Sequence, residues 1–350
     1  MPSTRTRGHE HPDRTGQLQR DLCRGRSRRS RGRRACRRRR PNGPAPVADG
    51  GEGSFEALCR GLGAVPVPVE VQNPWGMPAR AEIGITADGG TAVVELAQAG
   101  GITMAHDGDR DPVSASTYGT GMMIAEAVRH GARKILVATG GSATTDGGSG
   151  AIRAIQDAGG LRGAQLTVLS DVTTTFVDAA RVFGPQKGAD PATVKVLEER
   201  LARQASEFPR DPTGVLRSGA AGGFAGGMWA HFGAELVSGA DTVLNAVGFD
   251  RELEQATAVV VGEGRLDSQT AEGKIISTIL HRVRRSGRSL QVFAVVGSVS
   301  EDLGDYRENF ADVLVASDAA AMRAAGADIA VVVNSLPDGG RLPDAGMLQT

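Results

Sequence analysis

The segment from Gly140 to Gly150 combines the residue types that bind oxyanions, and it follows an apolar run directly. Its glycines would let backbone N–H groups approach an oxyanion, and a helix beginning after the loop would add the positive end of its dipole. The hydroxyl groups of Ser142, Thr144 and Thr145 are further donors, and the carboxylate of Asp146 could cap the helix or hold a metal ion. An ordinary tight turn with an Asp cap is the alternative, but the number of hydroxyl groups favours a loop that binds a ligand.

A second glycine-rich segment, Gly219–Gly227, precedes another expected helix. The backbone at Gly219, Gly222 and Gly223 could cradle a phosphate in the same way. Small residues also allow helices to pack closely, and this explanation is nearly as good as phosphate binding.

Acidic residues recur where apolar strands would end. Asp171 follows the run Leu166–Ser170, and Glu263 follows Val259–Gly262 with Asp267 close behind. Open α/β sheets bind ligands at the carboxyl ends of their strands. Phosphoryl transfer needs a carboxylate that accepts or orients the hydroxyl proton, and a divalent ion over the phosphates. Asp171 fits the first role, and Glu263 or Asp267 fits the second.

Phosphoryl transfer also needs cations against the negative charge that develops on the transferred group. The candidates are Lys187, Arg265 and Lys274. For each charged residue taken alone, a surface salt bridge is at least as good an explanation. The argument for a site therefore rests on their shared position at strand ends.

These side chains need a scaffold, and the apolar runs of the sequence predict one. Short runs between turn residues predict strands, and runs with helical periodicity predict helices. We expect strands over 65–71, 81–85, 91–96, 134–139, 166–169, 258–261, 291–296 and 311–315, and helices over 119–130, 151–158 and 319–327. Several of the strands are apolar throughout, as in parallel strands buried on both faces. The pattern predicts an α/β fold with a parallel sheet.

Other familiar motifs fail on inspection. Gly273-Lys274 is followed by Ile275 and lacks the first glycine of a Walker A loop, and Gly262-Glu263-Gly264 lacks the third glycine of a dinucleotide fingerprint. The histidines have neither metal-ligand spacing nor a paired Ser or Cys signature. They are His106, His130, His231 and His281 in the main part of the chain.

Length and composition favour an α/β protein of the cytoplasm. The chain of 350 residues is long enough for two domains, and 49 glycines with only 4% aromatic residues suit tight strand-to-helix turns. Three cysteines suggest neither a disulfide framework nor a spaced metal site. Apolar runs fall short of the ~18–20 residues that cross a bilayer, and the N-terminus lacks the apolar core of a secretory signal. We therefore expect no membrane partner.

Residues 1–43 differ from the rest of the chain. The run from Arg24 to Arg40 is nearly all Arg, Gly, Ser, Ala and Cys, so the remainder is acidic although the formal net charge is zero. The segment is a disordered tail, a nucleic-acid or nuclear-targeting patch, or an alanine-rich helix translated out of frame. We favour the last, because Ala and Gly codons of GC-rich DNA become CGN arginine codons one base out of frame. Nucleic acid is not an expected partner, because the arginines lack interleaved aromatics.

Between about Pro46 and Val299, six ordered segments resemble the class I glycerate kinases. They are Val47–Gly53, Thr117–Gly121, Gly140–Gly150, Val182–Ala189, Gly219–Gly223 and Gly262–Asp267. The resemblance implies transfer of the γ-phosphoryl group of ATP to D-glycerate with Mg²⁺. It also implies two α/β domains with the active site between them. One would be Rossmann-like and built from 44–65 and 240–333, and the other would be inserted over 66–239. Residues 334–350 hold Pro, Gly and Asp without periodicity, so we expect a loose tail there.

The resemblance also implies the roles of the site residues. Asp171 would be the base or orienting carboxylate, Lys187 and Arg265 would neutralise charge, and Glu263 and Asp267 would lie near Mg²⁺. The implied substrate- and phosphate-binding residues are Asp49, Gly50, Gly51, Glu52, Gly140, Gly141, Ser142, Thr144, Asp146, Gly219, Gly222, Gly223 and Lys274.

Two departures from the family pattern widen the choice of function. The family begins with an apolar strand, which residues 1–45 do not contain, and its Asp-Val-x-Asn-Pro segment is replaced by Asp171-Val172-Thr173-Thr174-Thr175. The alternatives are a kinase of a related small hydroxy acid, a non-catalytic binding protein, and an impaired product of a gene with a damaged N-terminus. The position of the phosphorylated hydroxyl and assembly into a homo-oligomer stay open.

Overall fold

The computed structural model describes residues 47–48, 50–51, 53–106, 111–266 and 275–335. These residues form two compact units. The large unit contains the described residues of 47–251 and 275–279, and the small unit contains 252–266 and 280–335. Residues 1–46, with the arginine-rich segment, lie outside the described residues, so none of the three interpretations of that segment is tested. The expected domain boundaries also stay predictions.

The large unit is built on one six-stranded sheet in which the strands follow chain order. The strands are β1 (Ala64–Gln72), β2 (Pro78–Thr86), β3 (Thr91–Glu95), β4 (Lys134–Ala138), β5 (Gln165–Leu169) and β6 (Glu235–Val237). The pairs β1–β2 and β2–β3 are antiparallel, and β3 to β6 are parallel. The outer strand β1 contains Pro66 and Pro68, which lack the N–H groups that could pair with a further strand.

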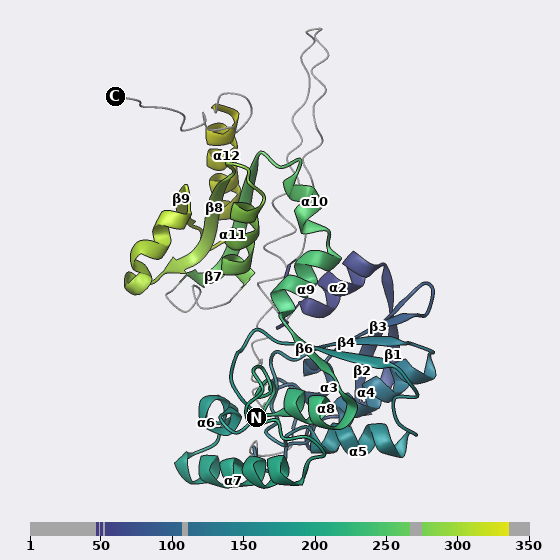
Figure 1. Cartoon of the computed structure of the whole chain (residues 1–350). Coiled ribbons are helices and arrows are strands. Elements are labelled where there is room, and N and C mark those ends of the chain that lie inside the picture. The colour runs from purple at the N-terminus through teal and green to yellow at the C-terminus, as the bar shows by residue number, and fades with distance from the viewer. Residues whose placement is uncertain (1–46, 49, 52, 107–110, 267–274, 336–350) are drawn as a thin grey trace, which may run out of the picture. The chain divides into compact units, whose positions relative to one another are not determined.

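Helices cover both faces of this sheet, because the side chains of its parallel strands are apolar on both (Figure 1). Val93, Leu136 and Leu169 pack against α2 (Ser54–Leu62) and α9 (Gly239–Ala246). The alternate residues of the strands, such as Ile135 and Val137, pack on the opposite face. That face is covered by α4 (Tyr118–Arg129), α5 (Ser149–Asp157) and α8 (Phe224–Phe232).

A third apolar cluster joins the helices that follow β5. Phe176, Leu197 and Leu201 are fully buried in it. The helices of this cluster are α6 (Ala179–Phe183), η1 (Pro185–Lys187) and α7 (Pro191–Glu207). Two short helices outside the cluster, α3 (Ala97–Gly100) and α10 (Phe249–Leu253), are the remaining helices described before β7. This cluster fixes the segment that carries Lys187.

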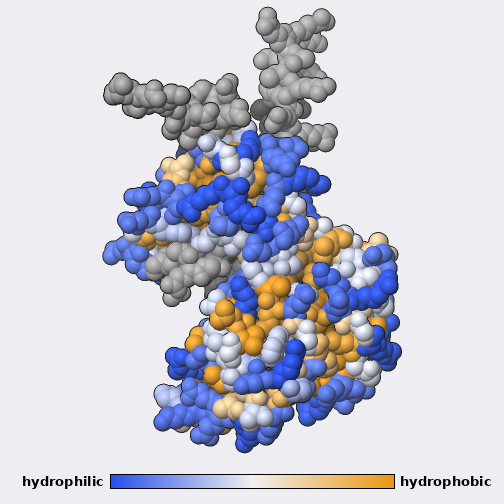
Figure 2. All heavy atoms as spheres, viewed as in Figure 1, coloured by the Kyte–Doolittle hydropathy of each residue, from blue (hydrophilic) through white to orange (hydrophobic). Residues whose placement is uncertain are grey.

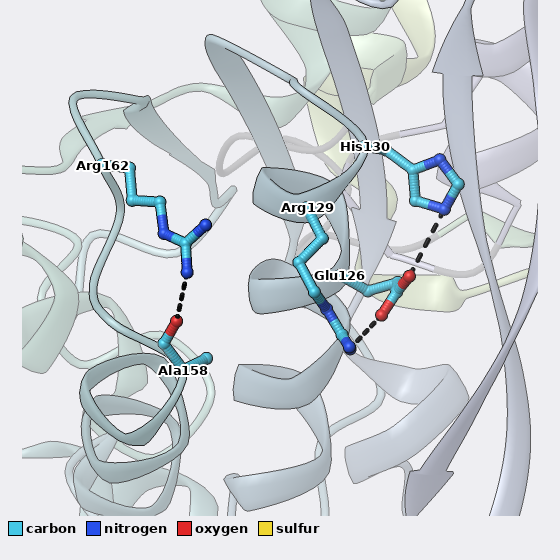
Figure 3. Close-up of polar contacts among 5 residues, drawn as sticks. All are labelled: Glu126, Arg129, His130, Ala158 and Arg162. Carbon is cyan, nitrogen blue, oxygen red and sulfur yellow. Dashed lines mark hydrogen bonds and ion pairs between the residues drawn. The ribbon is translucent and has the colours of Figure 1, made fainter.

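Surface polar contacts mark the carboxyl-terminal ends of α4 and α5, shown in Figure 3. Glu126 forms an ion pair with Arg129 and lies 3.4 Å from Nε2 of His130, and Arg162 donates a hydrogen bond to the carbonyl oxygen of Ala158 at 3.1 Å. The expected helices over 119–130 and 151–158 are thus confirmed within one or two residues. Their other ends, at Thr117 and Gly148, lie beside the glycine-rich loop.

The small unit contains a three-stranded parallel sheet in the order β7 (Ala258–Leu266), β8 (Gln291–Val299), β9 (Asp312–Val315). Helix α11 (Ile275–Arg285) precedes β8, and the 3₁₀ segment η3 (Glu301–Asn309) and helix α12 (Ala319–Ser335) follow β8 and β9. The α/β class with parallel strands is confirmed. Helix α12 is longer than the sequence predicted, because it continues through Asn334 and Ser335, where we expected a loose tail.

Strand β7 is also longer than predicted, which corrects the position of two site candidates. Glu263 and Arg265 lie within the strand, paired with Val296 and Ser298 of β8, and do not follow it. The glycines make this possible, since a Cβ at Gly297 would lie 2.6 Å from the carbonyl oxygen of Gly264. A side chain at that position would therefore push the two strands apart.

Apolar residues gather on the face of the large unit turned to the viewer in Figure 2, between more hydrophilic margins. More than half of a folded protein's surface is ordinarily contributed by apolar atoms. Among the described residues, no helix combines the length and apolar character needed to span a membrane.

Candidate functional site

The carboxyl ends of three parallel strands of the large unit converge on one set of residues. Gly140 follows β4, Asp171 follows β5 and Gly239 follows β6. The segment before α2 lies against them: the N–H of Gly140 donates to the carbonyl oxygen of Gly50 at 2.9 Å, and a Cβ at Gly140 would clash with the Cα of Gly51. We call Gly50, Gly51, Gly140, Asp171, Gly239 and Ala240 the strand-end cluster.

Asp171 is the carboxylate of this cluster. Its Oδ1 accepts a hydrogen bond of 3.1 Å from the N–H of Ala240 in the first turn of α9. A Cβ at Gly50 would lie 3.2 Å from Oδ2 of Asp171, and the backbone of Gly50 has φ +101°. Only a glycine tolerates both conditions easily. The fold therefore brings together the half-buried carboxylate of Asp171, the N-terminus of α9 and the backbone of Gly50, which carries no side chain.

The glycine-rich loop between β4 and α5 is bonded largely within the protein. The buried carboxylate of Asp146 accepts hydrogen bonds from the N–H groups of Gly148 and Gly150 at 3.0 and 3.1 Å, and from the N–H and hydroxyl of Thr117. The N–H of Ser149 bonds to the carbonyl oxygen of Asp146, and that of Ala151 to the hydroxyl of Thr117. The sequence predicted that the start of α5 would face a ligand, but the N–H groups of residues 148–151 are all bonded within the protein. The anion at this helix end is the protein's own carboxylate.

The hydroxyl-bearing residues of the loop are buried. Ser142 pairs with Gly101 in an isolated β-bridge, and Thr144 and Thr145 are fully buried. Within the described residues, the hydroxyl oxygens of Thr144 and Thr145 have no hydrogen-bond partner. Of the predicted ligand residues in this loop, Gly140 is half-buried and Gly141 is exposed. A ligand therefore reaches the loop most directly through the backbone of these two glycines.

Lys187 lies beneath the same loop. Its side chain is buried, and Nζ donates a hydrogen bond of 2.6 Å to the carbonyl oxygen of Thr144. Burial lowers the pKa of Lys187 from its usual 10.5 to about 7, although the nearby carboxylate of Asp146 acts in the opposite direction. Gln204 of α7 adds a bond from Nε2 to the carbonyl oxygen of Asp146 at 3.0 Å. Lys187 thus supports the loop from inside the protein.

The second glycine-rich segment packs directly on the first. The N–H of Gly147 donates to the carbonyl oxygen of Gly222 at 3.1 Å, and a Cβ at Gly222 would clash with the carbonyl oxygen of Thr144. Gly219 and Gly223 are buried, and a Cβ at Gly223 would meet Phe176 at 2.8 Å. These contacts are the close packing that the sequence offered as its alternative. The phosphate-binding role of the three glycines stays a prediction.

This packing leads to a stability prediction. Gly222→Ala is expected to lower the free energy of unfolding by about 2–5 kcal/mol, because the new methyl group meets Thr144 and the residue has φ +63°. Chemical denaturation measures the change. Gly214→Ala is the matched control, since a Cβ there would have nothing within 4 Å. Equal stability of the two variants would contradict the packing argument.

The remaining predicted site residues fall into two groups. Glu263 and Arg265 belong to the small unit, where Nη2 of Arg265 donates to the hydroxyl of Ser300 at 3.2 Å. Asp49, Glu52, Asp267 and Lys274 lie outside the described residues. Their predicted roles are therefore not tested.

Sequence reasoning missed two parts of the site. The start of α9 was not predicted, because β6 before it is only three residues long. The Ser238-Gly239 pair was the available signal, since Ser238 caps α9 by accepting a hydrogen bond from the N–H of Asp241. Thr117 was noticed only as part of a motif, and its bonds to Asp146 span 29 residues of sequence.

Known proteins are similar to this chain over most of its length. The model of the glycerate kinase family matches residues 32–160 and 156–330, a longer stretch than the six segments span. The chain is 33% identical to Glycerate 2-kinase of Escherichia coli K12 over 304 residues, which cover 77% of this chain and 79% of that protein. Identity to Glycerate kinase of Bacillus subtilis 168 is also 33% over 304 residues, with the same coverage of both chains.

A solved structure agrees with these relatives. The crystal structure of a protein of Salmonella typhimurium LT2, provisionally named glycerate kinase 2, superposes with a TM-score of 0.68 at 28% identity. The superposition covers 82% of this chain and 88% of that one. Given the family model, the relatives and this fold, the chain belongs to the glycerate kinase family, the enzymes that phosphorylate glycerate.

Proposed function

We propose that the protein transfers the γ-phosphoryl group of ATP to D-glycerate, with Asp171 as the carboxylate that accepts or orients the proton of the attacking hydroxyl. The observation that carries the proposal is the position of Asp171 at the carboxyl end of β5, bonded to the N-terminus of α9. Membership of the glycerate kinase family supplies the substrate class. A kinase of another hydroxy acid is not favoured by the comparisons.

The strand-end cluster supports this role for Asp171. The bond from Ala240 fixes the orientation of the carboxylate, and Gly50 brings backbone rather than a side chain to its other oxygen. A small hydroxy acid can approach this carboxylate, because the neighbouring Gly50 has no side chain that would block it. The exposed backbone N–H of Gly141, at the end of the neighbouring strand, is the proposed contact for phosphate oxygens, because the N–H of Gly140 already donates to Gly50.

Lys187 takes a different part in this proposal from the one that the sequence suggested. Its Nζ lies on the inner side of the loop, at the carbonyl oxygen of Thr144. We assign it to holding the loop in place, and Arg265 to the neutralisation of charge on the phosphates. The assignment of Arg265 rests on the family resemblance.

The metal is part of the same proposal. Mg²⁺ prefers oxygen ligands and in kinases is held by one or two carboxylates together with substrate phosphates. Glu263 offers a donor of this type, and Asp267 is its proposed companion. Among the described residues, no cluster of three His, Cys, Asp or Glu side chains could hold a metal, and Asp267 lies outside them. When bound, Mg²⁺ would neutralise phosphate charge.

A coupled assay tests the function. ADP release by the purified chain should depend on both D-glycerate and Mg²⁺, with a kcat in the range of about 1–100 s⁻¹ that is usual for kinases. Phosphorus NMR of the product identifies the phosphorylated hydroxyl. Incubation without glycerate is the control for ATP hydrolysis, and glycerol is the control for the acceptor. ADP release that is the same with and without D-glycerate would contradict the proposal.

The proposal includes a cytoplasmic location. Among the described residues, Cys59 is a free thiol buried against the sheet, an arrangement that a reducing compartment permits.

A further inference from the structure

Arg217 has a backbone conformation that is unusual for an arginine. Its φ is +71°, in the left-handed region that non-glycine residues rarely adopt. The conformation is held by hydrogen bonds on both sides: its N–H donates to the carbonyl oxygen of Thr173 at 3.3 Å, and its carbonyl oxygen accepts from Ala220 at 3.1 Å. Strain of this kind persists where the surroundings hold it, and it gathers at functional sites.

The consequence is that the arginine side chain is directed to the end of β5. Nη1 of Arg217 donates a hydrogen bond of 2.7 Å to the carbonyl oxygen of Ser170. Ser170 immediately precedes Asp171, and its carbonyl oxygen also accepts the N–H of Gly239 at 3.4 Å. The guanidinium group therefore lies one residue from the proposed catalytic carboxylate, at the edge of the strand-end cluster.

The guanidinium retains capacity for a ligand. Arg217 is half-buried, and Ser170 is its hydrogen-bond partner among the described residues. An arginine has five N–H donors in a planar fork, which matches a carboxylate with two parallel hydrogen bonds. Partial burial strengthens such a pair compared with one in bulk water.

We propose that Arg217 binds the carboxylate of the acceptor substrate and so selects hydroxy acids over neutral polyols. This inference rests on the proposed function. In glycerate the carboxylate is bonded to the carbon that carries the 2-hydroxyl and lies one carbon further from the 3-hydroxyl. An acceptor whose hydroxyl lies at Asp171 therefore has its carboxylate close by, and the guanidinium bound to Ser170, the residue before Asp171, is the proposed partner for it.

A purely structural role is the competing explanation, since the same bond could simply secure the end of β5. Replacement by glycine separates the two. Arg217→Gly removes the guanidinium and also relieves the left-handed backbone, so the fold is expected to remain stable. Arg162→Gly is the matched control: Arg162 has φ +50°, and its guanidinium also donates to a carbonyl oxygen, that of Ala158 beyond α5 (Figure 3).

Steady-state kinetics with D-glycerate and ATP give the test. Arg217→Gly should raise KM for D-glycerate by roughly 10- to 100-fold and leave KM for ATP within about twofold, which is the effect of losing one charge-assisted contact. The preference for glycerate over the neutral analogue glyceramide should fall by a similar factor, and added guanidinium ion should restore part of it. Arg217→Lys should have a KM for D-glycerate between those of the wild type and Arg217→Gly, because lysine keeps the charge and loses the planar fork of donors.

Two outcomes would overturn the inference. One is an unchanged KM for D-glycerate in Arg217→Gly. The other is a fall in thermal stability with equal changes in both KM values and no change in preference for glyceramide, which would mark a structural clamp. Arg162→Gly should behave as the wild type throughout. A wild type that neither turns over nor binds D-glycerate by calorimetry would overturn the proposed function together with this inference.

Discussion

Asp171→Asn is expected to lower kcat with D-glycerate by about 10³- to 10⁴-fold, while KM for ATP changes little. The substitution removes the group that accepts or orients the hydroxyl proton, and general-base catalysis typically contributes about 10²- to 10⁴-fold to a rate. The asparagine keeps the shape of the side chain, and its amide oxygen can still accept the hydrogen bond from Ala240. The fold of the strand-end cluster should therefore survive, and the loss should fall on chemistry.

A charge control separates this effect from a general electrostatic one. Asp241→Asn removes one negative charge from an exposed side chain in the first turn of α9, the helix whose Ala240 N–H binds Asp171. We expect it to retain kcat within about threefold, since exposed charges are screened. Steady-state kinetics and a titration with a nonhydrolysable ATP analogue measure both variants. Retention of turnover in Asp171→Asn, or equal losses in the two variants, would remove Asp171 from the catalytic role.

The second large effect is expected at Lys187, in the pH dependence of stability. Below about pH 7 the amino group is charged in both folded and unfolded states, and the folded state bears the unfavourable burial of that charge. Between about pH 7 and 10.5 the unfolded state retains a proton that the folded state has released. Stability should therefore rise with pH in this window, by up to about 1.4 kcal/mol per pH unit.

Lys187→Met should abolish that rise, so that the stability curves of wild type and variant cross. Near pH 6 the variant should be at least as stable as the wild type, because no charge is buried. Near pH 9 it should be less stable by about 1–3 kcal/mol, because the carbonyl oxygen of Thr144 has lost its donor.

Urea unfolding from pH 6 to 9 measures both curves, with Lys195→Met on the exposed face of α7 as the control. The upper limit avoids Cys59, whose pKa is raised to about 11 by burial and which would lower stability above pH 9. Parallel curves for Lys187→Met and wild type would show that Lys187 does not titrate in this range.

Much of the scaffold followed from local sequence patterns. The run at β4, the glycines after it and the start of α5 were all predicted, because apolar periodicity and glycine mark strands and turns without help from distant residues. The position of Asp171 after β5 followed for the same reason. The prediction failed for β7, where Gly262 and Gly264 were taken as the end of the strand and lie within it. The extension of β7 is possible because Gly297 of the neighbouring strand β8 has no side chain that would contact Gly264, and this contact is visible only in the folded structure.

The parts that escaped prediction depend on contacts between segments far apart in the chain. The sequence identified Asp146 as a possible cap or metal ligand. Only the folded structure shows that its carboxylate accepts hydrogen bonds from Thr117 and from the N–H groups at the start of α5. Lys187 lies 43 residues from Thr144, and no pattern relates the two. Arg217 stands between Leu216 and Ser218 in a segment that matches no motif, and its left-handed backbone is held by bonds to Thr173 and Ala220.

The carboxylate of Asp146 has a consequence for how the glycine-rich loop would meet the nucleotide of the proposed reaction. A loop that depends on phosphate to gather its amide groups would become ordered only when the nucleotide arrives, and part of the binding free energy would be lost in ordering it. Here the carboxylate of Asp146 holds the amide groups of Gly148 and Gly150. Under the proposed function, the N–H of Gly141 would therefore meet the phosphates as part of a loop whose shape is already fixed, and little binding free energy would be lost in ordering it.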